Sequence, residues 1–120
     1  MSTAARHRRG RRAELLARLW LRLKLYRILA VNWRSPLGEI DIVARRGRTI
    51  VIVEVKSRRD RHRLPEAIQH RQRLRLLRAA RHFLQCHPKH RECAVRFDAM
   101  LVRSLGLLHI HDAWQSDGSA

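Results

Sequence analysis

The sequence is poor in the residues that mark several classes of protein. Its 120 residues include two cysteines, Cys86 and Cys93, which are too few for a disulfide scaffold. No apolar run approaches the roughly 18 residues that a membrane-spanning helix requires. The basic N-terminal residues are not followed by an apolar stretch, so this segment does not resemble a secretory signal. The sequence therefore favours one small cytoplasmic domain without a membrane partner.

Acidic residues are also scarce, which leaves a large positive charge. Ten Asp and Glu residues oppose 27 Lys and Arg residues, and the formal net charge is +17 at pH 7. Such a charge points to a polyanion: DNA, RNA or an acidic membrane surface. Only three of the 27 basic residues are lysines, so a coding bias toward arginine is an alternative explanation for part of the charge. We favour nucleic-acid contact, because the charge acts on phosphates whatever its origin.

Hydrophobic spacing and turn residues predict one layered domain. We expect helices over 13–25 and 65–86, and strands over 27–33, 38–44, 50–56, 94–102 and 107–111. The order α-β-β-β-α-β-β favours an α/β fold with helices packed on one sheet. We expect a flexible basic arm over 1–12, a single domain over 13–114 and a disordered tail over 115–120.

The first expected helix has an apolar stripe on one side. Its members lie at helical spacing: Leu15, Leu16, Leu19 and Leu23. Glu14 is expected in the first turn of this helix, where a carboxylate suits the helix dipole.

Two neighbouring expected strands carry charged residues within otherwise apolar sequence that is typical of a protein core. Asp41 lies in the first strand, and Glu54 and Lys56 lie in the second. Side chains alternate along a strand, so Glu54 and Lys56 share a face, which Asp41 reaches if the hairpin register allows. Burying charges is costly unless they are paired or bind a metal. Asp41, Glu54 and the carbonyl of Val55 would suit Mg²⁺ or Mn²⁺, since hard cations take oxygen ligands.

This constellation suggests phosphodiester hydrolysis. A bound cation would polarise the phosphate and lower the pKa of a water for attack. Lys56 would orient that water or neutralise developing charge, and an ammonium suits this role better than a guanidinium. The alternatives are an exposed ion pair between Glu54 and Lys56, and an Asp41 that merely pairs with an arginine.

The segments 38–41 and 53–56, Gly-Glu-Ile-Asp and Val-Glu-Val-Lys, resemble the PD-(D/E)xK nuclease superfamily. More narrowly, residues 10 to 103 are similar to the small bacterial YraN-like proteins, predicted endonucleases related to archaeal Holliday-junction resolvases. The similarity extends to residues 10–14, 32–34, 71–73 and 96–98. It implies a restriction-endonuclease-like α-β-β-β-α-β core with a mixed central sheet flanked by helices. It also implies metal-dependent cleavage of DNA, with branched DNA such as Holliday junctions as a candidate substrate in repair or recombination.

The resemblance also implies roles for individual residues. Asp41 and Glu54 would be metal ligands, and Lys56 would be the catalytic lysine. Glu14 would approach the metal from the first helix, and Gln72 would lie near the site from the second. Because related resolvases act as dimers, a homodimer is also expected.

The chain departs from the family pattern at two positions. Arg71 stands where the family usually has lysine, a change that a phosphate contact tolerates more readily than a catalytic role. Leu25 stands where the family usually has glycine at the end of the first helix. A left-handed C-cap is costly for leucine, so we expect this helix end to differ.

A run of arginines directly follows Lys56. We expect Arg58 and Arg59, with Arg61 and Arg63, to grip phosphate at the cleft, the alternative being a solvated loop. Two other functions remain open for the whole chain. One is a nuclease-fold DNA-binding module without turnover, serving replication, repair or DNA uptake. The other is an arginine-rich RNA-binding protein.

Further polar residues are expected to be structural. The group His82, Cys86, His87, His90 and Cys93 lacks a Cys-x-x-Cys pair, which argues against zinc. His109 and His111 share a strand face but have no evident third ligand, so we expect surface residues. Asp98 is expected to pair with an arginine.

Overall fold

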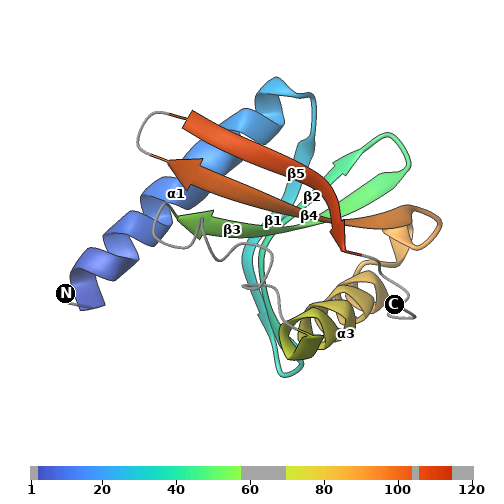
Figure 1. Ribbon diagram of the computed structural model, residues 1–120. Coiled ribbons are helices and arrows are strands. Elements are labelled where there is room, and N and C mark those ends of the chain that lie inside the picture. The colour runs from blue at the N-terminus through green and yellow to red at the C-terminus, as the bar shows by residue number, and fades with distance from the viewer. Residues whose placement is uncertain (1–2, 58–69, 104–105, 115–120) are drawn as a thin grey trace.

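The computed structural model describes residues 3–57, 70–103 and 106–114, with side chains for 11–57, 73–103 and 106–113. In chain order the elements are α1 (Thr3–Leu23), β1 (Arg27–Ser35), β2 (Gly38–Arg46), β3 (Thr49–Ser57), α3 (His70–Cys86), the 3-10 turn η2 (Pro88–His90), β4 (Ala94–Arg103) and β5 (Gly106–Trp114) (Figure 1). For the described residues, this order confirms the α-β-β-β-α-β-β prediction. The start expected at Pro65 for the second helix lies outside them.

The five strands form one mixed sheet. Their order is β1-β2-β3-β4-β5, so neighbours in sequence are neighbours in space. β3 and β4 are parallel, and their connection contains α3, whereas the other three pairs are antiparallel. The predicted fold class is confirmed: the chain is an α/β protein with a mixed central sheet, compatible with a nuclease-like core.

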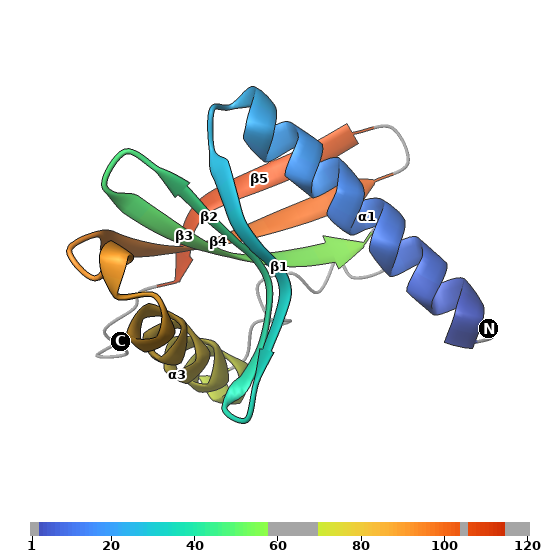
Figure 2. The same ribbon diagram turned by 180° about the vertical axis from the view of Figure 1, so that it is seen from behind.

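The two helices pack on opposite faces of this sheet (Figure 2). Strand alternation separates the two cores, because Ile52 of β3 packs with α3 whereas Val53 packs with α1. On the α3 side the helix contributes Leu76, Ala79, Ala80 and Phe83. Among the described residues, no helix is long and apolar enough to cross a membrane.

The prediction for α1 was wrong in its start and in its buried face. The helix begins at Thr3 instead of residue 13, so Glu14 lies in its interior. The face against the sheet consists of Ala13, Ala17 and Leu21. Small alanines at a spacing of four let the helix backbone approach the sheet closely, which larger side chains would prevent. The leucine stripe is exposed instead, and Leu23 reaches 77% exposure.

The end of α1 is left-handed in spite of its leucine. Leu25 has a φ of 69°, and its N–H donates to the carbonyl of Arg22. The N–H of Tyr26 donates to the carbonyl of Leu21, which completes a Schellman motif. The expectation that this helix end would differ from the glycine pattern was therefore wrong. Burial of Tyr26, at 4% exposure, holds the turn in place.

The tip of the β1–β2 hairpin meets α3. Gly38 has a φ of 149°, and a Cβ placed there would lie 3.4 Å from the carbonyl oxygen of Arg75 and 3.6 Å from the Cβ of Ala79. A Cβ would make ordinary contacts at these distances, but the positive φ would strain any side chain at this position. Figure 2 shows the hairpin tip beside α3, and residues of both elements line one cavity with Asp41 and Glu54.

Candidate active site

Asp41 occupies the point at which β2 and β3 separate. The ladder between these strands runs from the Arg46–Thr49 pair to the Ile42–Val53 pair and stops there. One residue further, Asp41 Oδ2 accepts a hydrogen bond of 2.8 Å from the backbone N–H of Val55. The side chain thus replaces a backbone partner, and this contact fixes the carboxylate at the open end of the hairpin.

Glu54 and Lys56 lie on the same face of β3, as the alternation predicts. Lys56 Nζ lies 3.3 Å from Glu54 Oε1, and the two side chains are only 18% and 12% exposed. Val53, the last paired residue of β3 in this ladder, is fully buried on the other face. Their burial argues against an ordinary surface ion pair, because charges withdrawn from water need further stabilisation.

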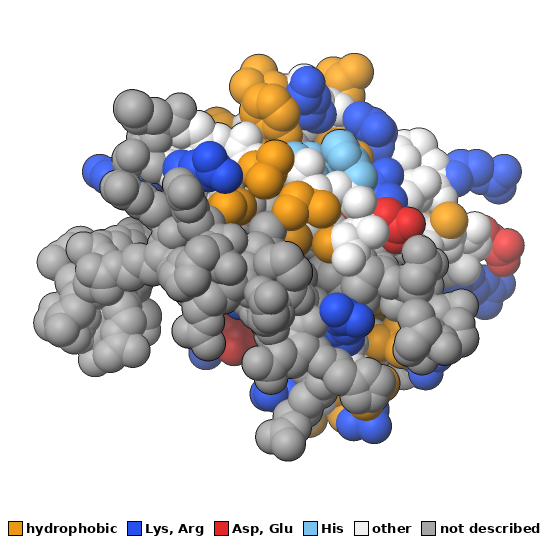
Figure 3. Space-filling model, in the orientation of Figure 1, with side chains coloured by type: hydrophobic (Ala, Val, Ile, Leu, Met, Phe, Trp, Pro, Cys, Tyr) orange, Lys and Arg blue, Asp and Glu red, His pale blue; other side chains and the backbone are white. Residues whose placement is uncertain are grey.

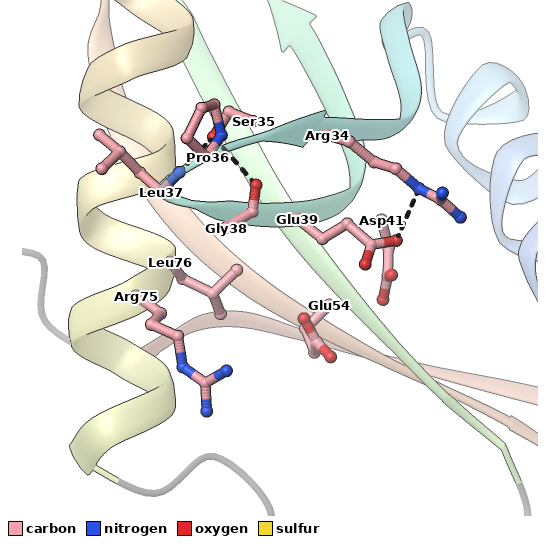
Figure 4. Close-up of a pocket in the computed structure, with 10 residues that line it drawn as sticks. All are labelled: Arg34, Ser35, Pro36, Leu37, Gly38, Glu39, Asp41, Glu54, Arg75 and Leu76. Atoms are coloured by element: carbon pink, nitrogen blue, oxygen red, sulfur yellow. Dashed lines mark hydrogen bonds and ion pairs between the residues drawn. The ribbon is translucent and has the colours of Figure 1, made fainter.

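Asp41 and Glu54 both line one cavity of about 570 Å³ (Figure 4). The tip of the β1–β2 hairpin forms one wall, and Arg75 and Leu76 of α3 form another. Glu39 lies at the rim, 3.4 Å from Arg34, and both of these side chains are largely exposed. The cavity is therefore lined by both acids, Asp41 and Glu54, and by arginines, Arg34 and Arg75.

Burial and neighbouring carboxylates disfavour ionisation of the two acids. Burial, followed by the charge of Asp41, raises the pKa of Glu54 to about 7, although Lys56 opposes the shift. Burial also raises the pKa of Asp41, while the Val55 hydrogen bond and Lys56 oppose it. The charge of Glu14 adds to the rise for Asp41, so α1 brings a third carboxylate into this electrostatic environment. A divalent cation would stabilise all of these charges.

The structure brings the central predicted residues together, namely Asp41, Glu54 and Lys56, and the charge of Glu14 acts on Asp41. Arg71 and Gln72 lie at the start of α3, but their side chains are outside the described part of the chain. Arg58 and Arg59 also lie outside it.

Sequence reasoning missed Arg75 as a lining residue of the cavity. The sequence did contain an indication of this role, because Arg75 follows Arg71 by four residues and both therefore lie on one side of a helix.

A second polar cluster lies on the α1 side of the sheet. Asp98, His109 and His111 can each offer one ligand atom, and these atoms lie within 4.8 Å of one another. Asp98 is fully buried and binds Arg96 at 2.8 Å, which confirms its expected arginine partner. Burial would raise the pKa of Asp98, but hydrogen bonds from His109, Arg96 and the backbone of Asp112 outweigh it and lower the pKa to about 2.

The expectation of two surface histidines was wrong for His109, whose side chain is 5% exposed. Its Nε2 lies 2.7 Å from Asp98 Oδ2. The third ligand-type side chain comes from the neighbouring strand β4. Strand order and register decide this neighbour, and the sequence pattern alone did not supply them.

The histidines and cysteines around η2 have separate partners. His90 accepts a hydrogen bond from Arg45, and His87 donates one to the carbonyl of Phe83. Cys86 Sγ lies 3.8 Å from His82 Nε2. Among the described residues, these side chains do not form a metal-ligand cluster of three.

The model of the Uncharacterised protein family UPF0102 matches residues 13–102. The chain belongs to this family. A UPF0102 protein of Parvibaculum lavamentivorans is 46% identical over 112 residues, which cover 92% of this chain and 84% of the relative. A UPF0102 protein of Paramagnetospirillum magneticum is 48% identical over 118 residues, which cover 94% and 92% of the two chains.

The two polar clusters differ in their relation to the matched segment. In this UPF0102 protein the segment includes Glu14, Asp41, Glu54 and Lys56, and it ends before His109 and His111. The acids of the cavity thus lie within the part that defines the family, whereas both histidines lie beyond it.

Proposed function

We propose that this UPF0102 protein is a YraN-like, metal-dependent endonuclease that hydrolyses phosphodiester bonds in DNA, including branched DNA such as Holliday junctions. One observation carries the proposal. Asp41 and Glu54 line a single cavity at the point where two strands separate, and Lys56 lies beside Glu54. The net charge of +17 supports a polyanionic substrate.

The donor set fits a hard divalent cation. The two carboxylates are largely withdrawn from water, and the charge of Asp41 disfavours ionisation of Glu54; a cation between them would remove this repulsion. Mg²⁺ binds through one or two carboxylates and retains several waters, for which the cavity has room. Asp41, Glu54 and the carbonyl of Val55 would hold Mg²⁺ or Mn²⁺. When bound, such an ion polarises a phosphate oxygen and acidifies a bound water.

The residues of the chain supply orientation and proton transfer. The N–H of Val55 fixes the Asp41 carboxylate, so this group needs little rearrangement on binding. Lys56 Nζ would donate to an attacking water or a phosphate oxygen. Burial and the charge of Asp41 raise the pKa of Glu54 to about 7 without a cation, so cation binding near neutral pH would release a proton from this group.

Other residues would hold the nucleic acid around this centre. Arg75 at the cavity edge would contact phosphate. The resemblance supports phosphate contacts by Arg58, Arg59 and Arg71, and a position near the site for Gln72. It further supports Glu14 as an acid near the cation and a homodimer as the acting species.

A cleavage assay tests the proposal. Duplex, flap and four-way DNA are incubated with Mg²⁺ or Mn²⁺, and with EDTA as the blank. Asp41→Asn, Glu54→Gln and Lys56→Met should each reduce cleavage at least 100-fold, whereas Glu92→Gln, an exposed acid far along the chain, should retain it. Lys56→Met should still bind Mn²⁺. Absence of cleavage by the wild-type protein, or full cleavage by Glu54→Gln, would overturn the nuclease assignment.

The net charge alone also favours a second candidate, nucleic-acid binding without turnover, with DNA or RNA as ligand. Tight binding that is indifferent to Lys56→Met, together with no cleavage, would favour this module. Competition between RNA and four-way DNA at physiological salt then identifies the ligand.

A further inference from the structure

The cluster on β4 and β5 has the ligand types of a transition-metal site. His109 and His111 are two residues apart on one strand, so their rings lie on the same face, with centroids 3.9 Å apart. Asp98 comes from the adjacent strand, where Ala99 pairs with Ile110. We propose that Asp98, His109 and His111 form a binding site for a first-row transition metal such as Zn²⁺, separate from the acid cavity.

The distances are close to those of a metal centre. Zinc bonds of about 2.0–2.1 Å at tetrahedral angles place ligand atoms roughly 3.3 Å apart. His109 Nε2 and Asp98 Oδ2 are 2.7 Å apart, and all three ligand atoms lie within 4.8 Å. The widest separation therefore has to close by at most about 1.5 Å (4.8 Å less 3.3 Å) on metal binding. Metal binding would replace the proton on His109 Nε2, which is released to solvent.

The surroundings hold the carboxylate as a metal site requires. Arg96 donates to both oxygens of Asp98 at 2.8 Å, and the backbone N–H of Asp112 donates to Oδ1 at 2.9 Å. Arg96 also donates to the hydroxyl of Tyr26. Hydrogen bonds of this kind orient a ligating carboxylate and set metal affinity. The positive charge of Arg96 will weaken the site relative to one with two carboxylates.

The ligand set selects the type of ion. Two imidazoles and one carboxylate suit Zn²⁺, Co²⁺, Ni²⁺ or Cu²⁺, whereas Mg²⁺ prefers oxygen ligands alone. His111 is exposed, and Figure 3 shows histidine side chains at the surface over β5, so an ion can enter from solvent. Three protein ligands leave a fourth position for water.

The cluster is independent of the proposed nuclease site. Asp98 alternates with Phe97 and Ala99, which pack on the α3 side, and so faces the α1 side. Glu54 continues the α3-side row of Ile50 and Ile52. The two sites therefore lie on opposite faces of the sheet, and loss of one function leaves the other testable.

Zn²⁺ titration of the full chain by calorimetry tests the proposal, with excess Mg²⁺ present to saturate the acid cavity. Co²⁺ titration followed by visible absorption reports the coordination. His111→Ala should weaken Zn²⁺ binding at least 10-fold and abolish the Co²⁺ bands, because it removes one of three ligands. His111→Gln repeats the test with a side chain of similar size, and circular dichroism checks the fold of both.

His82→Ala is the matched control, because it removes an imidazole from the other histidine and cysteine group. It should leave Zn²⁺ affinity unchanged, as should Asp41→Asn. No saturable Zn²⁺ binding by the wild-type protein would overturn the proposal. Unchanged affinity in His111→Ala, or lost affinity in His82→Ala, would do the same.

Discussion

Leu25 holds a backbone conformation that few side chains tolerate. Its φ of 69° lies in the left-handed region, where a Cβ meets the following carbonyl. The side chain is 81% exposed, so little packing compensates for this strain. The neighbouring Tyr26 is buried, and its hydroxyl accepts a hydrogen bond from Arg96. The buried position of Tyr26 therefore holds Leu25 in its strained conformation.

Leu25→Gly should stabilise the protein. Glycine relieves the left-handed strain, and its greater freedom in the unfolded chain offsets part of the gain. We expect a net increase of about 0.5–1 kcal/mol in the free energy of unfolding, measured by urea denaturation. Leu23→Gly is the matched control, since Leu23 is equally exposed but helical, and it should destabilise by about 1 kcal/mol. A decrease in stability for Leu25→Gly would contradict this account of the helix end.

Glu54 should make stability depend on pH. Its pKa is about 7 in the folded protein and 4.5 in the ordinary case. The pKa of Glu54 is higher in the folded protein than in the unfolded chain, so the stability linked to its protonation is fully present below about pH 4.5. That stability is lost as the pH rises through 7. In metal-free buffer, the free energy of unfolding of Glu54→Gln should rise relative to that of the wild type by roughly 1–3 kcal/mol between pH 5 and pH 8. Urea unfolding of both proteins across this range measures the difference, and a constant difference would refute the burial of the charge.

At the site, sequence reasoning succeeded where one strand decides the geometry. Alternation along β3 is enough to place Glu54 and Lys56 on one face. It does not reveal that the ladder ends at the Ile42–Val53 pair, which lets Asp41 reach the Val55 N–H. The His109 environment was missed for a related reason, because its partner Asp98 belongs to another strand.

Helix α1 illustrates the same limit at the scale of an element. The order and type of the described elements follow from periodicity and turn residues. The choice of buried face did not, because α1 carries two candidate stripes, one of leucines and one of Ala13, Ala17 and Leu21. Hydrophobicity favours the leucines, but the separation of helix and sheet favours the small residues. Packing distance is a property of the assembled layers, so the local sequence does not decide it.

Leu21 and Leu19 should therefore respond differently to truncation. Leu21 is fully buried against the sheet, and Leu21→Ala should cost about 2–5 kcal/mol of unfolding free energy. Leu19 is 47% exposed, and Leu19→Ala should change stability by no more than about 0.5 kcal/mol. Thermal or urea unfolding of both variants makes the comparison within one helix. Equal losses would show that the leucine stripe is covered in solution.

At the scale of the whole molecule, negative charge is concentrated around one cavity. The chain has ten acidic residues against 27 basic ones. Three of the ten line this cavity, namely Glu39, Asp41 and Glu54, and the charge of a fourth, Glu14, acts on Asp41. A strongly basic protein thus presents an acidic centre to an anionic ligand. Phosphate can reach this centre only if a cation or a loss of charge removes the repulsion.

The double variant Asp41→Asn/Glu54→Gln should consequently bind DNA more tightly than the wild type in EDTA, by roughly 10-fold. Ca²⁺, which shares the oxygen preference of Mg²⁺, should raise wild-type affinity toward that of the variant and leave the variant unchanged. The dependence of log affinity on log salt should be equal for both, because the arginines that contact phosphate are the same. Fluorescence anisotropy with a labelled four-way DNA measures each quantity, and Glu92→Gln should behave as the wild type. If the double variant binds no more tightly in EDTA, the two acids do not face the phosphate, and their place in a DNA-binding centre is excluded.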